Sequence, residues 1–137
     1  MAIVLDASAA ASMALGAEGA LALKELISAD EEVFAPDFLM VECANVFWKY
    51  VHAGKLGLRE AHACYRDAVS LATRYIRQND LMDEALATAA HLDHPVYDVL
   101  YLVLARRMAA TLITFDRGLL HLCKQEGVDC IHPLQIA

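Results

Sequence analysis

Four acidic residues lie where expected strands end or expected helices begin: Asp6, Glu42, Asp98 and Asp116. Asp6 ends the apolar run "IVL", and Asp116 comes two residues after the run "ATLIT". Glu42 and Asp98 lie near the starts of two expected helices, among apolar neighbours that would disfavour an unpaired charge. Because ligands of open α/β sheets bind beyond the carboxyl ends of the strands, we expect the four carboxylates to meet at one sheet edge.

Carboxylates gathered in this way repel one another unless cations offset their charge. Mg²⁺ and Mn²⁺ prefer oxygen ligands, and proteins usually hold them through a few carboxylates together with substrate phosphate. Such an ion activates a water molecule and neutralises charge on a scissile phosphate, so the predicted chemistry is phosphodiester hydrolysis with Mg²⁺ or Mn²⁺ as cofactor. An aspartate after a strand can also simply cap the next helix, and that alternative stays open for Asp6 and Asp116.

The four acids would meet in a fold in which strands and helices alternate, and the sequence has that pattern. Strands are expected at 2–5, within 31–37, and at 73–78, 110–114 and 128–133. Helices are expected after the first strand and at 16–29, 37–54, 57–72, 79–92, 95–108 and 115–127, with Asp37 and either Asn79 or Asp80 as caps. This alternation predicts an α/β fold of three layers, a mainly parallel sheet of about five short strands with helices on both faces. Residues 1–137 are expected to form a single domain.

Composition narrows the class of protein. The net charge of −7 argues against a general nucleic-acid binder, although an acidic protein can act on RNA when its carboxylates hold cations. No lysine or arginine precedes Lys24 and no apolar run is long enough to span a bilayer, so we expect a cytoplasmic protein with no membrane contact. The four cysteines form no CxxC pair, which argues against a zinc site.

Four segments in order, "IVLDASAAASMAL", "APDFLMVECANVFWKYV", "VYDVLYLVLARRM" and "TLITFDRGLL", resemble the successive motifs of PIN-domain ribonucleases. The short length most resembles the VapC-type toxins of toxin–antitoxin modules, and the resemblance covers essentially the whole chain. It implies a metal-dependent endoribonuclease with a PIN-like fold. It also implies that Asp6, Glu42, Asp98 and Asp116 are catalytic and hold Mg²⁺ or Mn²⁺.

The same resemblance suggests supporting roles for three further residues: Ser8, Asn45 and Thr114. Ser8 matches a small hydroxyl residue after the first acid, although it could instead cap the helix. Asn45 is one turn beyond Glu42 and therefore on the same helical face. Thr114 precedes Asp116 by two strand positions, so its side chain should point to the same side, but it could also be a strand residue chosen for its β propensity.

Partners follow from the resemblance too. It implies an RNA substrate, a homodimer, and a cognate VapB-like antitoxin lying over the segment "FLMVECANVFWKYV" and blocking the acidic site. Two alternatives remain open, and a third is set aside. A PIN fold could serve mainly as a protein-binding module with little catalysis, and the six histidines could offer acid–base cleavage of RNA. A phosphoacceptor domain is set aside, because its first strand would end in adjacent acids.

Overall fold

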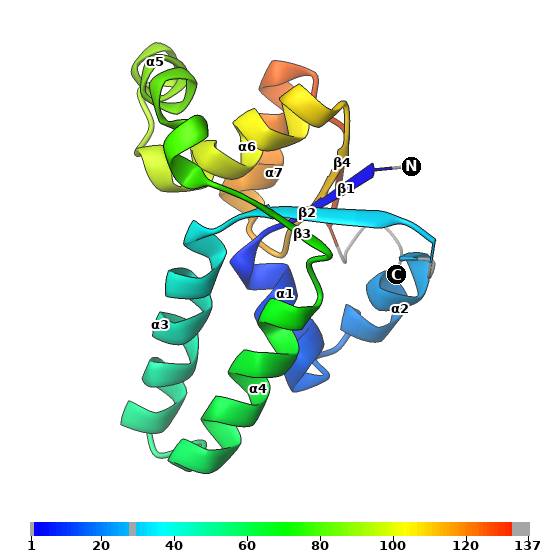
Figure 1. Ribbon diagram of the computed structural model, residues 1–137, viewed down its shortest axis with the longest axis vertical. Helices are drawn as coiled ribbons and strands as arrows, with labels where there is room; N and C mark the ends of the chain where they lie inside the picture. The colour runs from blue at the N-terminus through cyan, green and yellow to red at the C-terminus, as the bar shows by residue number, and fades with distance from the viewer. Residues whose placement is uncertain (1, 28–29, 133–137) are drawn as a thin grey trace.

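The computed structural model describes residues 2–27 and 30–132, and in that part of the chain a five-stranded sheet lies between two groups of helices (Figure 1). The strands are β1 (Ala2–Leu5), β2 (Glu32–Pro36), β3 (Arg74–Ile76), β4 (Thr111–Ile113) and β5 (Cys130–Ile131). Their order across the sheet is β3-β2-β1-β4-β5, and every neighbouring pair is parallel. The predicted α/β fold with helices on both sheet faces is confirmed.

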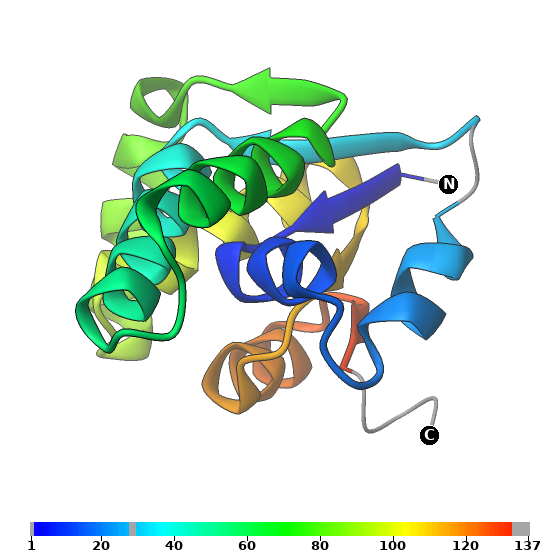
Figure 2. The ribbon, with the colours of Figure 1, turned by 90° about the horizontal axis from the view of Figure 1, so that it is seen from below.

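The helices divide between the two faces as Figures 1 and 2 show. One face carries α1 (Ala7–Leu15), α2 (Ala20–Leu26), α3 (Phe38–His52) and α4 (Leu58–Ser70); the other carries α5 (Met82–Leu92), α6 (Val96–Met108) and α7 (Arg117–Glu126). One turn of 3₁₀ helix, η1 (Gln78–Asp80), joins β3 to α5. Helix α6 packs on three strands, and residues 99–105 are all buried, as expected for a helix that is apolar on every side. In the described part of the chain, no helix is both long and apolar enough to cross a membrane.

The register of the central strand determines what meets at the sheet edge. Val4 lies opposite Phe34 on β2 and Leu112 on β4, and Leu5 lies opposite Ile113. Helices cover both faces of β1, which accounts for its uninterrupted apolar sequence. Because the chain turns to β2 on one side of β1 and later to β4 on the other, the carboxyl end of β1 is a topological switch point.

The predicted caps of two helices are wrong. Asp37 precedes α3, but its side chain makes no cap; its Oδ1 instead accepts a hydrogen bond from the Gln78 backbone N–H at 2.9 Å and so ties the end of β2 to η1. Asn79 and Asp80 do not cap α5, because both lie within η1 and Leu81 occupies the cap position. In both cases the cause is η1, the short 3₁₀ turn between β3 and α5. It supplies the backbone N–H that binds Asp37, and it contains Asn79 and Asp80.

The helix predicted at 16–29 is shorter than expected. Gly16 has a φ of 67° and ends α1 with backbone bonds to Met13 and Ser12, a conformation that glycine adopts without strain. Helix α2 therefore starts only at Ala20, after Gly19, which also has a positive φ. Residues 28–29 of this prediction, and residue 133 of the last predicted strand, lie outside the described residues. The other predicted elements are present with ends shifted inward by a few residues.

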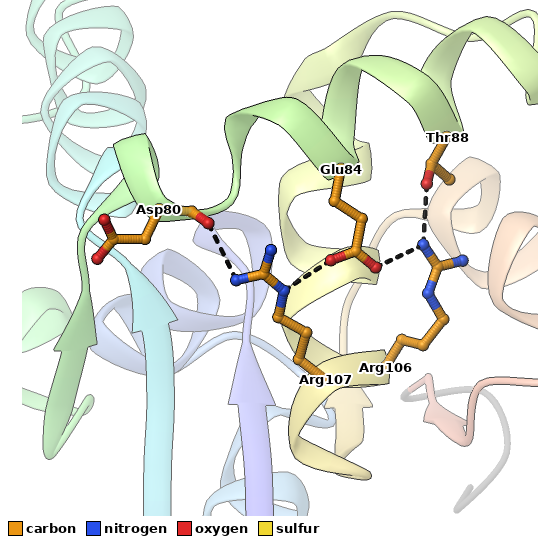
Figure 3. A network of polar contacts seen from close by, with 5 residues as sticks. All are labelled: Asp80, Glu84, Thr88, Arg106 and Arg107. Carbon is orange, nitrogen blue, oxygen red and sulfur yellow. Dashed lines mark hydrogen bonds and ion pairs between the residues drawn. The ribbon is translucent and has the colours of Figure 1, made fainter.

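A polar network fastens α5 to α6 (Figure 3). Glu84 accepts hydrogen bonds from Arg106 Nη2 at 2.9 Å and from Arg107 Nε at 2.6 Å. Arg106 also donates to Thr88 Oγ1 at 2.9 Å, and Arg107 donates to the Asp80 carbonyl at 3.0 Å. Although partial burial opposes the effect, these two arginines lower the pKa of Glu84. Both arginines thus hold α5 and α6 together.

Candidate active site

Asp6 lies at the carboxyl end of the central strand and is almost completely buried. Its Oδ1 accepts hydrogen bonds from the Ala9 backbone N–H at 2.8 Å and from Ser8 Oγ at 2.7 Å, so it caps α1. The Thr114 hydroxyl donates to its Oδ2. Burial, with a smaller contribution from the nearby charge of Glu42, raises the pKa of Asp6 to about 7, although these three hydrogen bonds favour the charged form.

Two hydroxyl groups connect the first and last acids. Thr114 Oγ1, which donates to Asp6, also accepts the Asp116 backbone N–H at 2.9 Å. Ser8 Oγ accepts the Phe115 backbone N–H at 2.9 Å. The turn after β1 and the turn after β4 are therefore joined by side chains about a hundred residues apart in sequence. Ser8 and Thr114 contact the acids directly, whereas the Ser8 side chain does not cap α1.

Asp116 begins α7 and is exposed. Its Oδ1 accepts the backbone N–H groups of Gly118 at 2.7 Å and Leu119 at 3.2 Å, which makes it the N-cap. A Cβ atom at position 118 would lie 3.1 Å from that same oxygen, so glycine leaves room for the cap. The capping alternative holds for both Asp6 and Asp116, and it does not exclude a further role for either carboxylate.

Glu42 lies in the second turn of α3 and is half-buried. Its Oε1 accepts a hydrogen bond of 2.5 Å from the hydroxyl of Tyr101 on α6. Burial raises the pKa of Glu42; the Tyr101 bond opposes that effect, and the charges of Asp98 and Asp116 add to it. The Tyr101 hydroxyl thus holds the Glu42 carboxylate, whereas the negative charges of Asp98 and Asp116 repel it.

Asp98 lies in the first turn of α6, also half-buried. Its Oδ2 is 3.8 Å from His94 Nε2, just before the helix. Burial raises the pKa of Asp98, the charge of Asp116 raises it further, and His94 lowers it. His94 Nδ1 lies 2.9 Å from the Pro95 carbonyl oxygen.

These contacts and charge effects show that the four acids lie near one another at one edge of the sheet. In Figure 1 this edge is the left end of β2, from which α3 departs. Asp6, Glu42 and Asp98 each have a pKa raised partly by another member of the set. Asn45 does not join them: it is exposed, and among the described residues no side chain hydrogen-bonds to it.

The donor set fits a hard divalent cation, since all four residues offer carboxylate oxygens whose mutual repulsion such an ion would relieve. Within residues 2–27 and 30–132, however, no three acidic, histidine or cysteine side chains are close enough to hold one ion as they stand. Mg²⁺ keeps several waters and often binds through one or two carboxylates plus substrate phosphate, so a preformed cage of three is not required.

Sequence reasoning missed two residues. Tyr101 belongs to the run "VLYLVLA", in which a tyrosine resembles any other core residue, and only the folded chain brings its hydroxyl to Glu42 of α3. The second residue is His94, which lies just before α6 and contacts Asp98. The spacing of four between His94 and Asp98 was a signal that could have indicated their contact.

Comparison with known proteins places this geometry in a family. The PIN domain family matches residues 3–125. A characterised relative, ribonuclease VapC3 of Pyrobaculum aerophilum, is 29% identical over 121 residues, which cover 87% of this chain and 92% of the relative.

Solved structures share the fold. The crystal structure of PAE2754 from Pyrobaculum aerophilum superposes with a TM-score of 0.71 at 24% identity, covering 99% of this chain and 96% of that one. A chain of a toxin–antitoxin complex from Klebsiella pneumoniae superposes with a TM-score of 0.63 at 14% identity, covering 96% and 97%. At these identities the structural likeness concerns the fold.

Proposed function

We propose that this chain, which belongs to the PIN domain family, is a metal-dependent endoribonuclease and the toxin of a toxin–antitoxin pair. The observation that carries the proposal is the convergence of Asp6, Glu42, Asp98 and Asp116 at one sheet edge, where the charges of neighbouring acids contribute to the raised pKa values of Asp6, Glu42 and Asp98. The relative named a ribonuclease supports the activity.

The proposed chemistry follows from the negative charge of the four acids. A bound Mg²⁺ or Mn²⁺ ion would supply an activated water and neutralise charge on the scissile phosphate. Asp6, Glu42, Asp98 and Asp116 would hold the ion, with Ser8 and Thr114 keeping Asp6 in place. Attack of water at phosphorus displaces the 3′ oxygen, so the products carry 5′-phosphate and 3′-hydroxyl ends. Because the reaction does not use the 2′-hydroxyl, cleavage should persist at a 2′-deoxy position.

The test is cleavage of a mixed cellular RNA pool by the purified, partner-free protein in Mg²⁺, in Mn²⁺ and in EDTA. Asp98→Asn should lower the rate by about 100-fold or more, because it removes a charge that acts on the reacting centre. Asp93→Asn is the matched control: it removes the same charge from an exposed residue five positions away, and asparagine tolerates the positive φ of 51° found there.

Metal-dependent cleavage with 5′-phosphate ends, lost in Asp98→Asn and kept in Asp93→Asn, would support the proposal. Cleavage that survives both EDTA and the Asp98 substitution would overturn it in favour of histidine chemistry. A folded protein that binds metal but cuts no RNA would favour the protein-binding module. The comparison of Mg²⁺ with Mn²⁺ also identifies the preferred ion.

We propose that the antitoxin docks on α3 and α4. A cavity of about 170 Å³ opens between these helices and is lined mainly by apolar side chains: Ala44, Phe47, Trp48, Val51, Leu58, Ala61, His62 and Tyr65. Trp48 is 57% exposed and stacks on His52, with ring centroids 5.1 Å apart. A large exposed aromatic residue beside an apolar cavity is typical of a binding anchor. The neighbour solved as a toxin–antitoxin complex supports such a partner.

Trp48 is the sole tryptophan of the chain, so its fluorescence reports on this surface directly. Titration with a purified VapB-like antitoxin should change that fluorescence. Trp48→Ala should weaken the complex at least about 10-fold, measured by calorimetry, because truncating a buried aromatic anchor costs about 2 kcal/mol or more. RNA cleavage by the free variant should be unchanged, and equal affinity of the variant and the original protein would contradict this docking site.

We further propose a homodimer in the cytoplasm, where an RNA substrate is available. Helix α5 supports the dimer, since Leu86 is 66% exposed and Met82 lies one turn before it, also exposed. Sedimentation velocity of the partner-free protein tests the assembly: a monomer at micromolar concentration would contradict it.

A further inference from the structure

Tyr101 is a core residue with one polar atom, and that atom faces the acidic site. The side chain is 1% exposed and comes from the middle of α6, where residues 99–105 are all buried. Its hydroxyl donates to Glu42 Oε1 at 2.5 Å. Since a buried hydroxyl needs a hydrogen-bond partner, the position of Tyr101 and that of the Glu42 carboxylate depend on each other.

The bond connects a rigid element to a side chain that the other acids repel. Asp98 and Asp116 both act against the charge of Glu42. Short O–H···O⁻ bonds of about 2.5–2.7 Å are among the stronger hydrogen bonds in proteins. Tyr101 therefore opposes the displacement of Glu42 that its neighbours favour, and it contacts Oε1 alone.

We propose that Tyr101 is a positioning residue: its hydroxyl holds one oxygen of Glu42 in place so that the carboxylate is preset to bind a divalent cation. This inference rests on the metal-dependent function proposed above. Partners that orient a metal ligand typically change metal affinity by about 10- to 100-fold when they are removed. Tyr101 itself touches neither substrate nor metal in this role.

The test is Mn²⁺ binding by the RNA-free protein, measured by electron paramagnetic resonance. Tyr101→Phe should raise the Mn²⁺ dissociation constant about 10-fold or more. Tyr75→Phe is the matched control, because the Tyr75 hydroxyl makes a bond of similar length, 2.6 Å, to the Val69 carbonyl and contacts none of the acids. It should leave the Mn²⁺ dissociation constant unchanged.

Two replacements at position 101 separate donation from packing. 4-Aminophenylalanine retains an N–H donor and should keep near-normal Mn²⁺ affinity. 4-Methylphenylalanine fills the volume of the hydroxyl without donating and should behave like Tyr101→Phe, which keeps the test available if the smaller variant does not fold. Equal Mn²⁺ affinity with and without a donor would overturn the inference.

A double-mutant cycle tests the route through Glu42. In a Glu42→Gln background, Tyr101→Phe should cause little further loss of Mn²⁺ affinity, because the positioned carboxylate is already gone. Fully additive losses would overturn the inference. If Asp98→Asn loses Mn²⁺ and Tyr101→Phe does not, this inference fails while the nuclease proposal stands; if the unsubstituted protein binds no Mn²⁺, both fail.

Discussion

At the scale of the residue, Asp6 caps a helix with the same carboxyl group that we propose as a metal ligand. It caps α1 through the Ala9 backbone and binds the hydroxyls of Ser8 and Thr114, all of which favour a charged acceptor. Burial has the opposite effect and raises its pKa to about 7. Near neutral pH and without metal, Asp6 is therefore divided between its neutral and charged forms.

This pKa predicts that the metal-free protein loses stability as pH rises from about 4 to about 7. In that window the unfolded chain has released the Asp6 proton, starting at its ordinary pKa of 3.8, while the folded protein still keeps it. The unfolded state then binds fewer protons, so the free energy of unfolding falls with pH, by at most about 4 kcal/mol for this group.

Urea unfolding in EDTA at pH 5 and at pH 7.5 measures the effect. Asp6→Asn, which cannot ionise, should flatten the dependence, and Mg²⁺ should restore stability at the higher pH. A free energy of unfolding that increases over this range, and equally in Asp6→Asn, would refute the assignment.

The sequence allows some residues of the candidate site to be predicted and not others. Asp6 and Asp116 could be placed at the site because each follows a strand, and strand ends share an edge. The Tyr101 contact could not be predicted, since it joins two helices that are far apart in the sequence, and sequence neighbours carry no record of that contact. Asn45 shares a helical face with Glu42, yet it is exposed, and the sequence pattern does not show how far along that face the site extends.

At the scale of the element, α5 depends on a few contacts to stay in place. It packs mainly on α6, and Glu84 accepts hydrogen bonds from two arginines of that helix (Figure 3). Its opposite side is exposed at Leu86. The Glu84 contacts therefore fix the orientation of the surface that we propose for the dimer.

Glu84→Gln should loosen α5 selectively. The substitution removes the charge that pairs with Arg106 and Arg107, and because these groups are partly exposed the loss should be about 1 kcal/mol or less. Hydrogen exchange should rise at the amides of α5 and not at those of α3. Asp83→Asn, an exposed neighbour on the same helix, should change neither, and unaltered exchange in Glu84→Gln would show that the network does not hold the helix.

The existence of nearly every element could be predicted, because short apolar runs distinguish the strands from the longer helices, whose apolar residues recur about every 3.6 positions. The ends could not, since they depend on competing hydrogen bonds. Asp37 was expected to cap α3, and it bonds to Gln78 forty-one positions later instead. Only the folded chain places those two residues together.

At the scale of the whole molecule, β1 is the strand on which the sheet depends. It pairs with β2 on one side and β4 on the other, and Ile3, Val4 and Leu5 are 0–1% exposed. The alternation of elements predicted a parallel sheet but not the order β3-β2-β1-β4-β5, because strand pairing joins segments far apart and leaves no local pattern.

Native-state hydrogen exchange should show this dependence. The amides of β1 should exchange only when the whole molecule unfolds, whereas α2, which has no side-chain cap at its start, should exchange through local opening. Small amounts of denaturant distinguish exchange through global unfolding from exchange through local opening. The rate of global exchange rises with denaturant as steeply as the unfolding equilibrium does, because unfolding exposes the most surface. Faster exchange in β1 than in α2 would contradict this account.

The central position of β1 also has a consequence for synthesis of the chain. β1 is translated first, yet one of its edges has no partner until residues 111–113 have been made. Until then Asp6 lacks the Thr114 hydroxyl, and Asp116 does not yet exist. A ribosome making this protein consists largely of RNA, so the order of translation itself delays completion of the acidic site until most of the chain has emerged.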